Sequence, residues 1–254
     1  MKKIIILQLL LILTINLFSN DYINMNSFKK RRVSYYCNQD INNVQKLIQQ
    51  DLESILEYKE DYDEELYLTL ENNLLIEKIN FMPTNENTKK EIYLFLNNQI
   101  LKNELFISNK NLKKLSCDYL VSVADLKTRQ LDYLSAAKMY AESMQIKDLY
   151  LMAIKNDKKS PTAMMGYALW LYFAPPIVGG GYKESYKKFQ EAEKKAILKE
   201  DLYFVLIYKS QLLLKMNHIE EARNCLKKAN SLFVNETFTE SIEEMNEKGI
   251  LFFD

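Results

Sequence analysis

Glycine and proline are scarce in this chain of 254 residues, which contains five glycines and four prolines. Three of the glycines stand together at positions 179–181, so few turn-forming residues remain for the rest of the chain. A fold of many short strands needs a turn signal about every 8 to 12 residues. The scarcity therefore excludes a many-stranded β architecture and favours long helices with short connections.

The chain also lacks an excess of charge of either sign. Lys and Arg together number 34, Asp and Glu together number 34, and the formal net charge is zero. Nucleic-acid-binding proteins normally carry a positive patch that neutralises phosphates. We therefore expect no nucleic-acid partner. The hydrophobic content of 48% is ordinary for a folded protein.

Cysteine and histidine are too few for most metal sites and for a disulfide framework. The three cysteines, Cys37, Cys117 and Cys225, are odd in number and widely spaced, and His218 is the single histidine. We expect no metal and no cofactor. One bridge between Cys37 and Cys117 stays an alternative, because only geometry decides whether two cysteines can pair.

One long hydrophobic run is present, at residues 4–18, after Lys2 and Lys3 and before Ser19. This order is typical of a signal peptide, so we expect residues 1–20 to be removed by cleavage between Ser19 and Asp21. The run is short against the roughly 20 residues that span a bilayer. An uncleaved anchor, which would attach the protein to a membrane, is the alternative. No cysteine follows the run closely, so we expect a periplasmic or secreted protein without a lipid-modified cysteine.

Helical periodicity covers nearly every segment beyond residue 37. Val44, Leu47, Ile48 and Ile55 form the first apolar stripe, and comparable stripes follow along the chain. Residues 66–70 also alternate as a strand would, which leaves a second interpretation there. We divide the mature chain into an N-terminal helical region at 21–110, either degenerate repeats or a cap, and a repeat region at 111–254.

Three groups of residues repeat in the C-terminal half. The second and third groups are 37 positions apart, and the first precedes the second by 39 positions. A two-helix unit with a period of about 34 residues, whose second helix carries such a group, is the tetratricopeptide layout. We therefore predict an all-α, tetratricopeptide-like solenoid of antiparallel helix pairs, in which small side chains let neighbouring helices approach closely. The groups are Ile146, Tyr150 and Ala153; Ser185, Phe189 and Ala192; and Ala222, Leu226 and Ala229.

An unusual segment at 168–186 holds the only tryptophan, two of the four prolines and three of the five glycines. The two prolines must end the helix before them. The segment is either a binding surface, as long loops of repeat proteins often are, or a stiff turn whose aromatic residues fill the core. The candidate binding residues are Trp170, Tyr172, Phe173, Pro175, Pro176, Gly180, Gly181 and Tyr182.

The same segment carries a family resemblance. Ala168, Trp170, Tyr172, Phe173, Ala174 and Pro175, then Gly179, Gly180 and the helix with Ser185, Phe189 and Ala192, resemble the tetratricopeptide T component associated with TRAP transporters. The resemblance covers about residues 112–233. It implies a periplasmic protein that partners the solute-binding subunit of a transporter and passes a hydrophobic ligand through a tunnel. The family's lipid-modified cysteine is missing here.

No set of residues in the sequence suggests catalysis. A lone histidine in a turn offers no activated nucleophile, and no phosphate-binding glycine loop follows a strand. We therefore expect an exported binding or adaptor protein and not an enzyme, with a protein partner and a small apolar ligand. The alternative is a scaffold of the cell envelope that braces other proteins and holds no ligand.

Overall fold

The architecture is entirely helical in the part of the chain that the structure describes, which is residues 23–83, 85–233 and 237–252 of a computed structural model. Eleven α-helices are joined by short turns, and no strand occurs in these residues. The all-α prediction is therefore confirmed. The signal-peptide prediction falls on residues 1–20, which lie outside the described ranges. The helices are α2 (Met25–Tyr36), α3 (Ile41–Glu57), α4 (Glu64–Asn80), α5 (Glu86–Ile107), α6 (Cys117–Gln130), α7 (Ala136–Asn156), α8 (Pro161–Phe173), α9 (Tyr182–Lys195), α10 (Lys199–Lys215), α11 (Ile219–Asn230) and α12 (Phe238–Glu247).

Side-chain caps mark where several helices begin. The Asp40 carboxylate accepts from two backbone N–H groups at the start of α3, and Asp63 does the same for one N–H of α4. Asn85 and Thr88 form a capping box at the start of α5. These caps satisfy N–H groups that have no partner within the helix. The capped start of α4 also makes residues 66–70 helical, so their alternation does not mark a strand.

The last three helix hairpins form the regular part of the molecule. Helix α6 packs on α7, α8 on α9 and α10 on α11, and each hairpin also contacts the next one. The second helix of each hairpin carries one of the three repeated groups, and all nine of these side chains are buried, with exposed fractions between 0% and 3%. The helix pairing and the burial of the groups agree with the sequence prediction.

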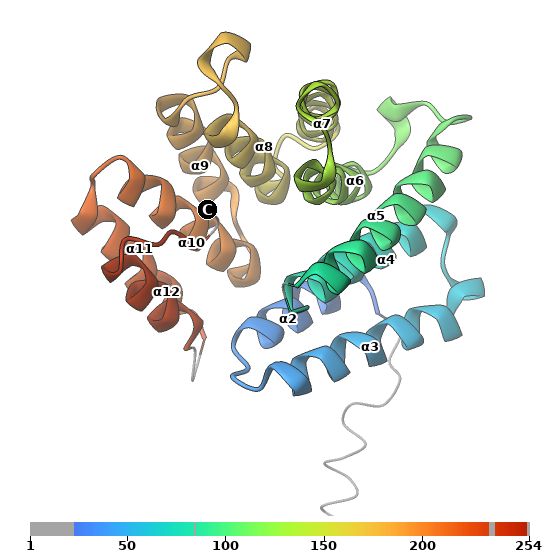
Figure 1. The fold of residues 1–254 in the computed structure, drawn as a ribbon, viewed down its shortest axis with the longest axis horizontal. Coiled ribbons are helices and arrows are strands. Elements are labelled where there is room, and N and C mark those ends of the chain that lie inside the picture. The colour runs from blue at the N-terminus through green and yellow to red at the C-terminus, as the bar shows by residue number, and fades with distance from the viewer. Residues whose placement is uncertain (1–22, 84, 234–236, 253–254) are drawn as a thin grey trace, which may run out of the picture.

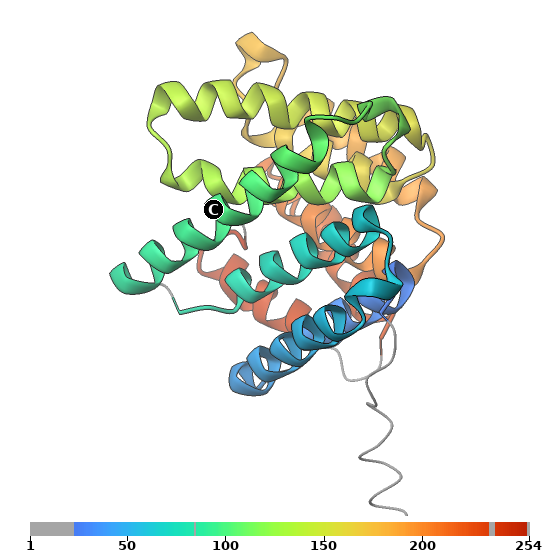
Figure 2. The ribbon, with the colours of Figure 1, turned by 90° about the vertical axis from the view of Figure 1, so that its right-hand side faces the viewer.

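The helices form a curved wall, and the N-terminal part of this wall contacts its C-terminal part. Helix α2 contacts α3 and α4 and also packs against α10, which is far away in the sequence. Figure 1 shows α2–α7 on one side and α8–α12 on the other, and Figure 2 shows the same layers turned by 90°. This closure places α2, α6, α8 and α10 around a common centre.

Two large apolar clusters form the core. The first joins α2–α4 and α6–α8, and the second joins α2 and α8–α12. Cys37 packs against the second cluster and Cys117 against the first. Among the described helices, none is both long and apolar enough to cross a membrane.

Candidate functional site: a central cavity

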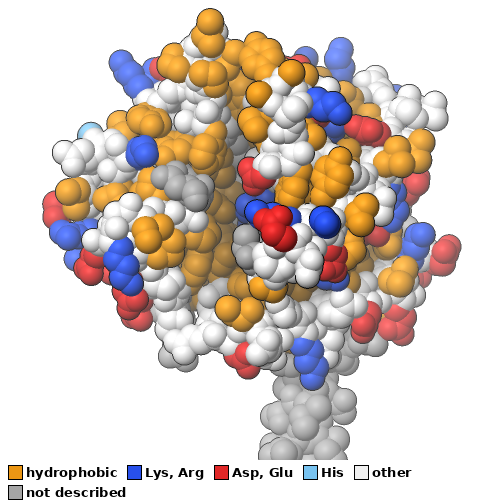
Figure 3. Space-filling view, in the orientation of Figure 1, with side chains coloured by type: hydrophobic (Ala, Val, Ile, Leu, Met, Phe, Trp, Pro, Cys, Tyr) orange, Lys and Arg blue, Asp and Glu red, His pale blue; other side chains and the backbone are white. Residues whose placement is uncertain are grey.

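A cavity of about 1750 Å³ lies at the centre of the molecule. Its lining comes from α2, α4–α8, α10 and α12, so both halves of the chain contribute to it. Figure 3 shows the hollow between the two halves, with hydrophobic side chains along its walls. The volume is above the 300 to 1,000 Å³ or so that is usual for a small-molecule site.

Arg32 of α2 reaches into this cavity and is held by two other helices. Its Nε atom lies 2.6 Å from a carboxylate oxygen of Glu77 in α4. Its Cζ atom lies 4.2 Å from the ring centre of Phe204 in α10, a cation–π contact. Burial acts to lower the pKa of Arg32, but the charge of Glu77 together with Tyr36, Tyr208 and Asp125 raises it above its ordinary value. The guanidinium is therefore charged and held in place.

Asp125 and Arg129 of α6 face the same space. The Tyr150 hydroxyl donates to Asp125 across 2.5 Å. Burial raises the pKa of Asp125, while the Tyr150 hydrogen bond and the charges of Arg32 and Arg129 oppose this rise. Arg129 lines the cavity with an exposed side chain and makes no ion pair or hydrogen bond with the residues that the structure describes. The cavity lining thus contains two guanidinium groups: Arg32 is held by an ion pair, and Arg129 is not.

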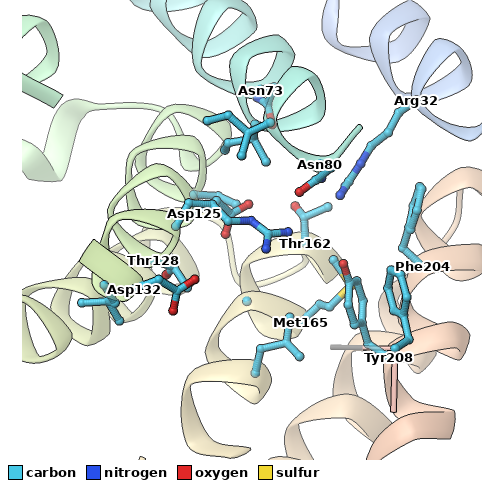
Figure 4. A pocket seen from close by; sticks show the side chains of 18 of the residues that line it. Arg32, Asn73, Asn80, Asp125, Thr128, Asp132, Thr162, Met165, Phe204 and Tyr208 are labelled. Atoms are coloured by element: carbon cyan, nitrogen blue, oxygen red, sulfur yellow. The ribbon is translucent and has the colours of Figure 1, made fainter. Parts of the chain in front are cut away.

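The wall opposite these charges is aromatic and apolar. In Figure 4, Phe204 and Tyr208 of α10 project side by side toward the space that Arg32 and Asp125 also face, and Met165 of α8 lies beside Tyr208. Asn80 donates to the Tyr36 hydroxyl at 3.0 Å and to Glu77 at 3.2 Å, which fixes the polar edge of this wall. A ligand here would meet polar groups on one side and rings on the other.

A second charged group lines another part of the cavity. Lys29 pairs with Asp201 at 2.9 Å, and both side chains are largely buried. Asp118, about three turns before Arg129 on the same face of α6, lines the cavity near Lys29, and burial raises its pKa. This group holds two carboxylates and one lysine.

The structure divides the aromatic residues that the sequence singled out into two sets. Trp170 and Phe173 line the cavity together with Pro175. The Trp170 indole N–H donates to the Ser143 carbonyl at 2.8 Å, and only 7% of the residue is exposed. Phe173, in contrast, is 59% exposed. This set forms one rim of the cavity.

Tyr172 and Tyr182 form the other set, on the opposite side of α8. Their rings stack with centres 5.3 Å apart, and Tyr172 belongs to the second core cluster. Neither residue lines the cavity, and neither do Pro176, Gly180 and Gly181. Because residues 170 and 172 are two positions apart on a helix, their side chains point in different directions.

The glycines of this segment have a backbone role. Gly181 has φ 141°, and its N–H donates to the Leu171 carbonyl at 2.7 Å. A Cβ atom on Gly180 would lie 1.9 Å from the Ala174 carbonyl oxygen. The loop therefore packs directly against the end of α8, which no larger residue at 180 would allow.

The sequence analysis did not identify Arg32, Asp125, Arg129, Phe204 or Tyr208 as site residues. Arg32 lies within a basic stretch at 29–32, and the other four sit inside ordinary amphipathic patterns. Their convergence depends on the packing of α2, α6 and α10 around one centre. A weak signal was available, because only four arginines occur in the chain and two of them line the cavity.

Comparisons with known proteins assign this chain to no family. No protein-family model matches the chain, and no curated protein matches its sequence.

Proposed function

We propose that this chain is an exported binding protein that holds a small organic ligand in its central cavity and presents it to a protein partner. The observation that carries the proposal is the cavity of about 1750 Å³, whose walls come from both halves of the chain. Rings and aliphatic side chains cover much of the wall, and a few polar groups converge at its centre. Such a combination is the usual composition of a ligand site.

We further propose that the helix hairpins are tetratricopeptide-type repeats and that the chain is a relative of the T component of TRAP transporters. The buried repeated groups on α7, α9 and α11 support the repeat type. The partner would then be the solute-binding subunit of a transporter. The exposed loop with Ile177 and Tyr182, which are 92% and 41% exposed and do not line the cavity, is our candidate docking surface for that partner.

Binding fits the central groups better than catalysis does. The residues that carry protons or charges there are Tyr150, Asp125, Arg32 and Glu77, and they are mostly paired with one another. His218, the single histidine, lies away from the cavity at the start of α11 and pairs with Glu221. A nucleophile activated by a neighbouring base is not among these groups.

A scaffold without a ligand is the second candidate. The observation in its favour is the burial of Tyr172, which packs as a core residue and not as a contact surface. A scaffold does not need a large internal cavity, however, because interiors normally pack densely. We therefore place ligand binding first.

The decisive experiment isolates the tagged mature chain, residues 21–254, from its own cell envelope and analyses both bound proteins and bound small molecules by mass spectrometry. A matched pair of substitutions locates the ligand. Leu169→Trp fills the cavity, which Leu169 lines, whereas Leu151→Trp adds the same bulk at a 40% exposed position of α7 that does not line it. We expect Leu169→Trp to lose a small molecule that wild type and Leu151→Trp both retain.

Equal ligand content in the three proteins, with all of them folded, would contradict the cavity as the ligand site. The partner is tested separately with Ile177→Ala combined with Tyr182→Ala, two exposed residues that do not line the cavity. We expect this double variant to lose a transporter solute-binding subunit from the co-purified proteins but to keep the small molecule. Retention of that subunit would show that the partner docks on another surface of the protein.

A further inference from the structure

We infer that the ligand of the central cavity is an amphipathic organic anion, whose oxyanion head group binds between Arg32 and Arg129 while its apolar body lies along the ring-lined wall. This inference rests on the proposed function, which requires only that the cavity holds a small molecule. It adds the charge and the orientation of that molecule.

The first argument is the number of hydrogen-bond donors without an acceptor. A guanidinium group has five N–H donors and no acceptor of its own. The Arg32 side chain is only 20% exposed, yet its contact with Glu77 is not aligned as a hydrogen bond, and its Nε–H has no hydrogen-bond acceptor among the described residues. Buried donors in native proteins are normally satisfied by protein, water or ligand. Glu77 occupies the Nε side of the guanidinium, so an oxyanion would supply acceptors to the other N–H donors of Arg32, which make no hydrogen bond with a described residue.

The second argument is that the two arginines act on the same place. Both lower the pKa of Asp125, and both lower the pKa of Tyr208 on the facing helix α10. Arg32 comes from α2 and Arg129 from α6, so a head group between them would be bound by side chains of two different helices. Arginine is suited to this because its planar fork matches the two oxygens of a carboxylate or phosphate.

The carboxylates of the lining outnumber its cations, but most of them are paired, hydrogen-bonded or exposed. Asp201 pairs with Lys29, and Asp125 accepts from Tyr150. The charge of Lys29 also acts on Asp118. The exposed carboxylates are those of Asp132, Glu240 and Glu244. Arg129 is likewise exposed, but it is the arginine of the lining that makes no ion pair with a described residue.

The wall next to Arg32 fits an apolar body. Phe204 lies under the guanidinium, and Phe28, Val121, Met165 and Leu169 also line the cavity. Burying a chain of methylene groups against such a wall is favourable, because it removes apolar surface from water. Ligand orientation follows, because the charged end can be satisfied only at the arginines.

The experiment measures the affinity of the mature chain for a matched set of probes by titration calorimetry. The probes are decanoate, decyl phosphate, decanol and decylamine, which share one apolar chain and differ in the head group. Trp170 is the only tryptophan and lines the cavity, so its fluorescence reports in parallel whether a probe enters. The variants are Arg129→Gln, Arg129→Lys and the control Arg223→Gln, whose arginine pairs with Glu220 on exposed α11, outside the cavity.

We expect at least one of the two anionic probes to bind at least about tenfold more tightly than decanol. Arg129→Gln should remove about a factor of ten from that anion's affinity and leave decanol binding unchanged, while Arg129→Lys should restore part of the preference. Arg223→Gln should behave as wild type. Decanoate preference alone would identify a carboxylate ligand, and decyl phosphate preference alone a phosphate monoester.

Three results would overturn the inference. Equal affinities for decanol and both anions, or tightest binding of decylamine, would refute the anionic head group but leave a cavity ligand in place. An anion preference that survives Arg129→Gln would refute the assigned head-group site. Binding of none of the probes would count against the proposed ligand function as well.

Discussion

The N-terminal helices and the C-terminal hairpins are stabilised in different ways. In α10, five consecutive residues from Tyr203 to Ile207 are buried, with exposed fractions of 3% or less, and all of them are apolar. Helices α4 and α5 instead enclose a polar cluster with α6, the first helix of the hairpins. There the Asn72 side chain donates to Asn103 and Ser122 at 3.0 and 3.1 Å and accepts from Gln99 at 2.8 Å.

The difference shows that the same helical architecture can be specified by shape or by hydrogen bonds. Repeated small and large side chains select one packing of the C-terminal hairpins. In the N-terminal helices a shift of register would leave buried amides without partners, which costs more than an imperfect apolar contact. The cavity lies where these two regions meet, and both of them supply rings and charged groups to its lining.

The largest expected effect tests packing in the C-terminal hairpins. Phe189→Ala removes a fully buried ring from the middle repeated group. We expect a loss of about 4 kcal/mol in the free energy of unfolding, because the transfer and cavity costs add. Chemical denaturation measures it. Ile197→Ala, at a 92% exposed position, should cost less than about 0.5 kcal/mol; similar losses for both variants would contradict the packing described here.

The next effect tests the ion pair that joins α2 to α4. Arg32→Met leaves the Glu77 carboxylate, whose side chain is 2% exposed, without its counter-charge. We expect a loss of about 3 kcal/mol in the free energy of unfolding. Adding Glu77→Leu should recover most of that loss, since the buried charge is then gone. A double variant as unstable as Arg32→Met alone would show that the pair is not coupled.

A smaller effect tests the polar cluster of the N-terminal helices. Asn72→Ala leaves Asn103, Gln99 and Ser122 short of partners, and we expect a loss of about 2 kcal/mol in the free energy of unfolding. Asn98→Ala on the exposed side of α5 is the matched control and should be close to neutral. If Asn72→Ala is also neutral, hydrogen bonds do not distinguish this region from the C-terminal hairpins.

The smallest effect is a pH dependence at the junction of the two regions. Burial raises the pKa of Asp125, which faces Tyr150, Arg32, Glu77 and Arg129. A bound anion would raise this pKa further, so binding favours the protonated carboxyl and affinity should increase as the pH falls. We expect decanesulfonate, which stays ionised, to bind about threefold more tightly at a pH near 5 than near 7.5. Calorimetry on Asp125→Asn should give a flatter profile, and an unchanged profile would assign the dependence to another group.

The sequence by itself determined the elements of this fold and their pairing in the C-terminal half. Pro175 ends α8 because of its missing N–H, and the groups around Tyr150, Phe189 and Leu226 are buried where their spacing places them. These features are local or repeat at short range, so side-chain chemistry and helical periodicity were sufficient to predict them.

The site was decided by the tertiary structure alone. Trp170 and Phe173 line the cavity, but Tyr172 turns into the core, because α8 presents its faces to different neighbours. Arg32 meets Phe204 and acts on Asp125 only because α2 closes onto α10 and α6. Contacts between residues so far apart in the chain depend on how the curved wall of helices closes, and no periodicity within a single helix encodes that closure.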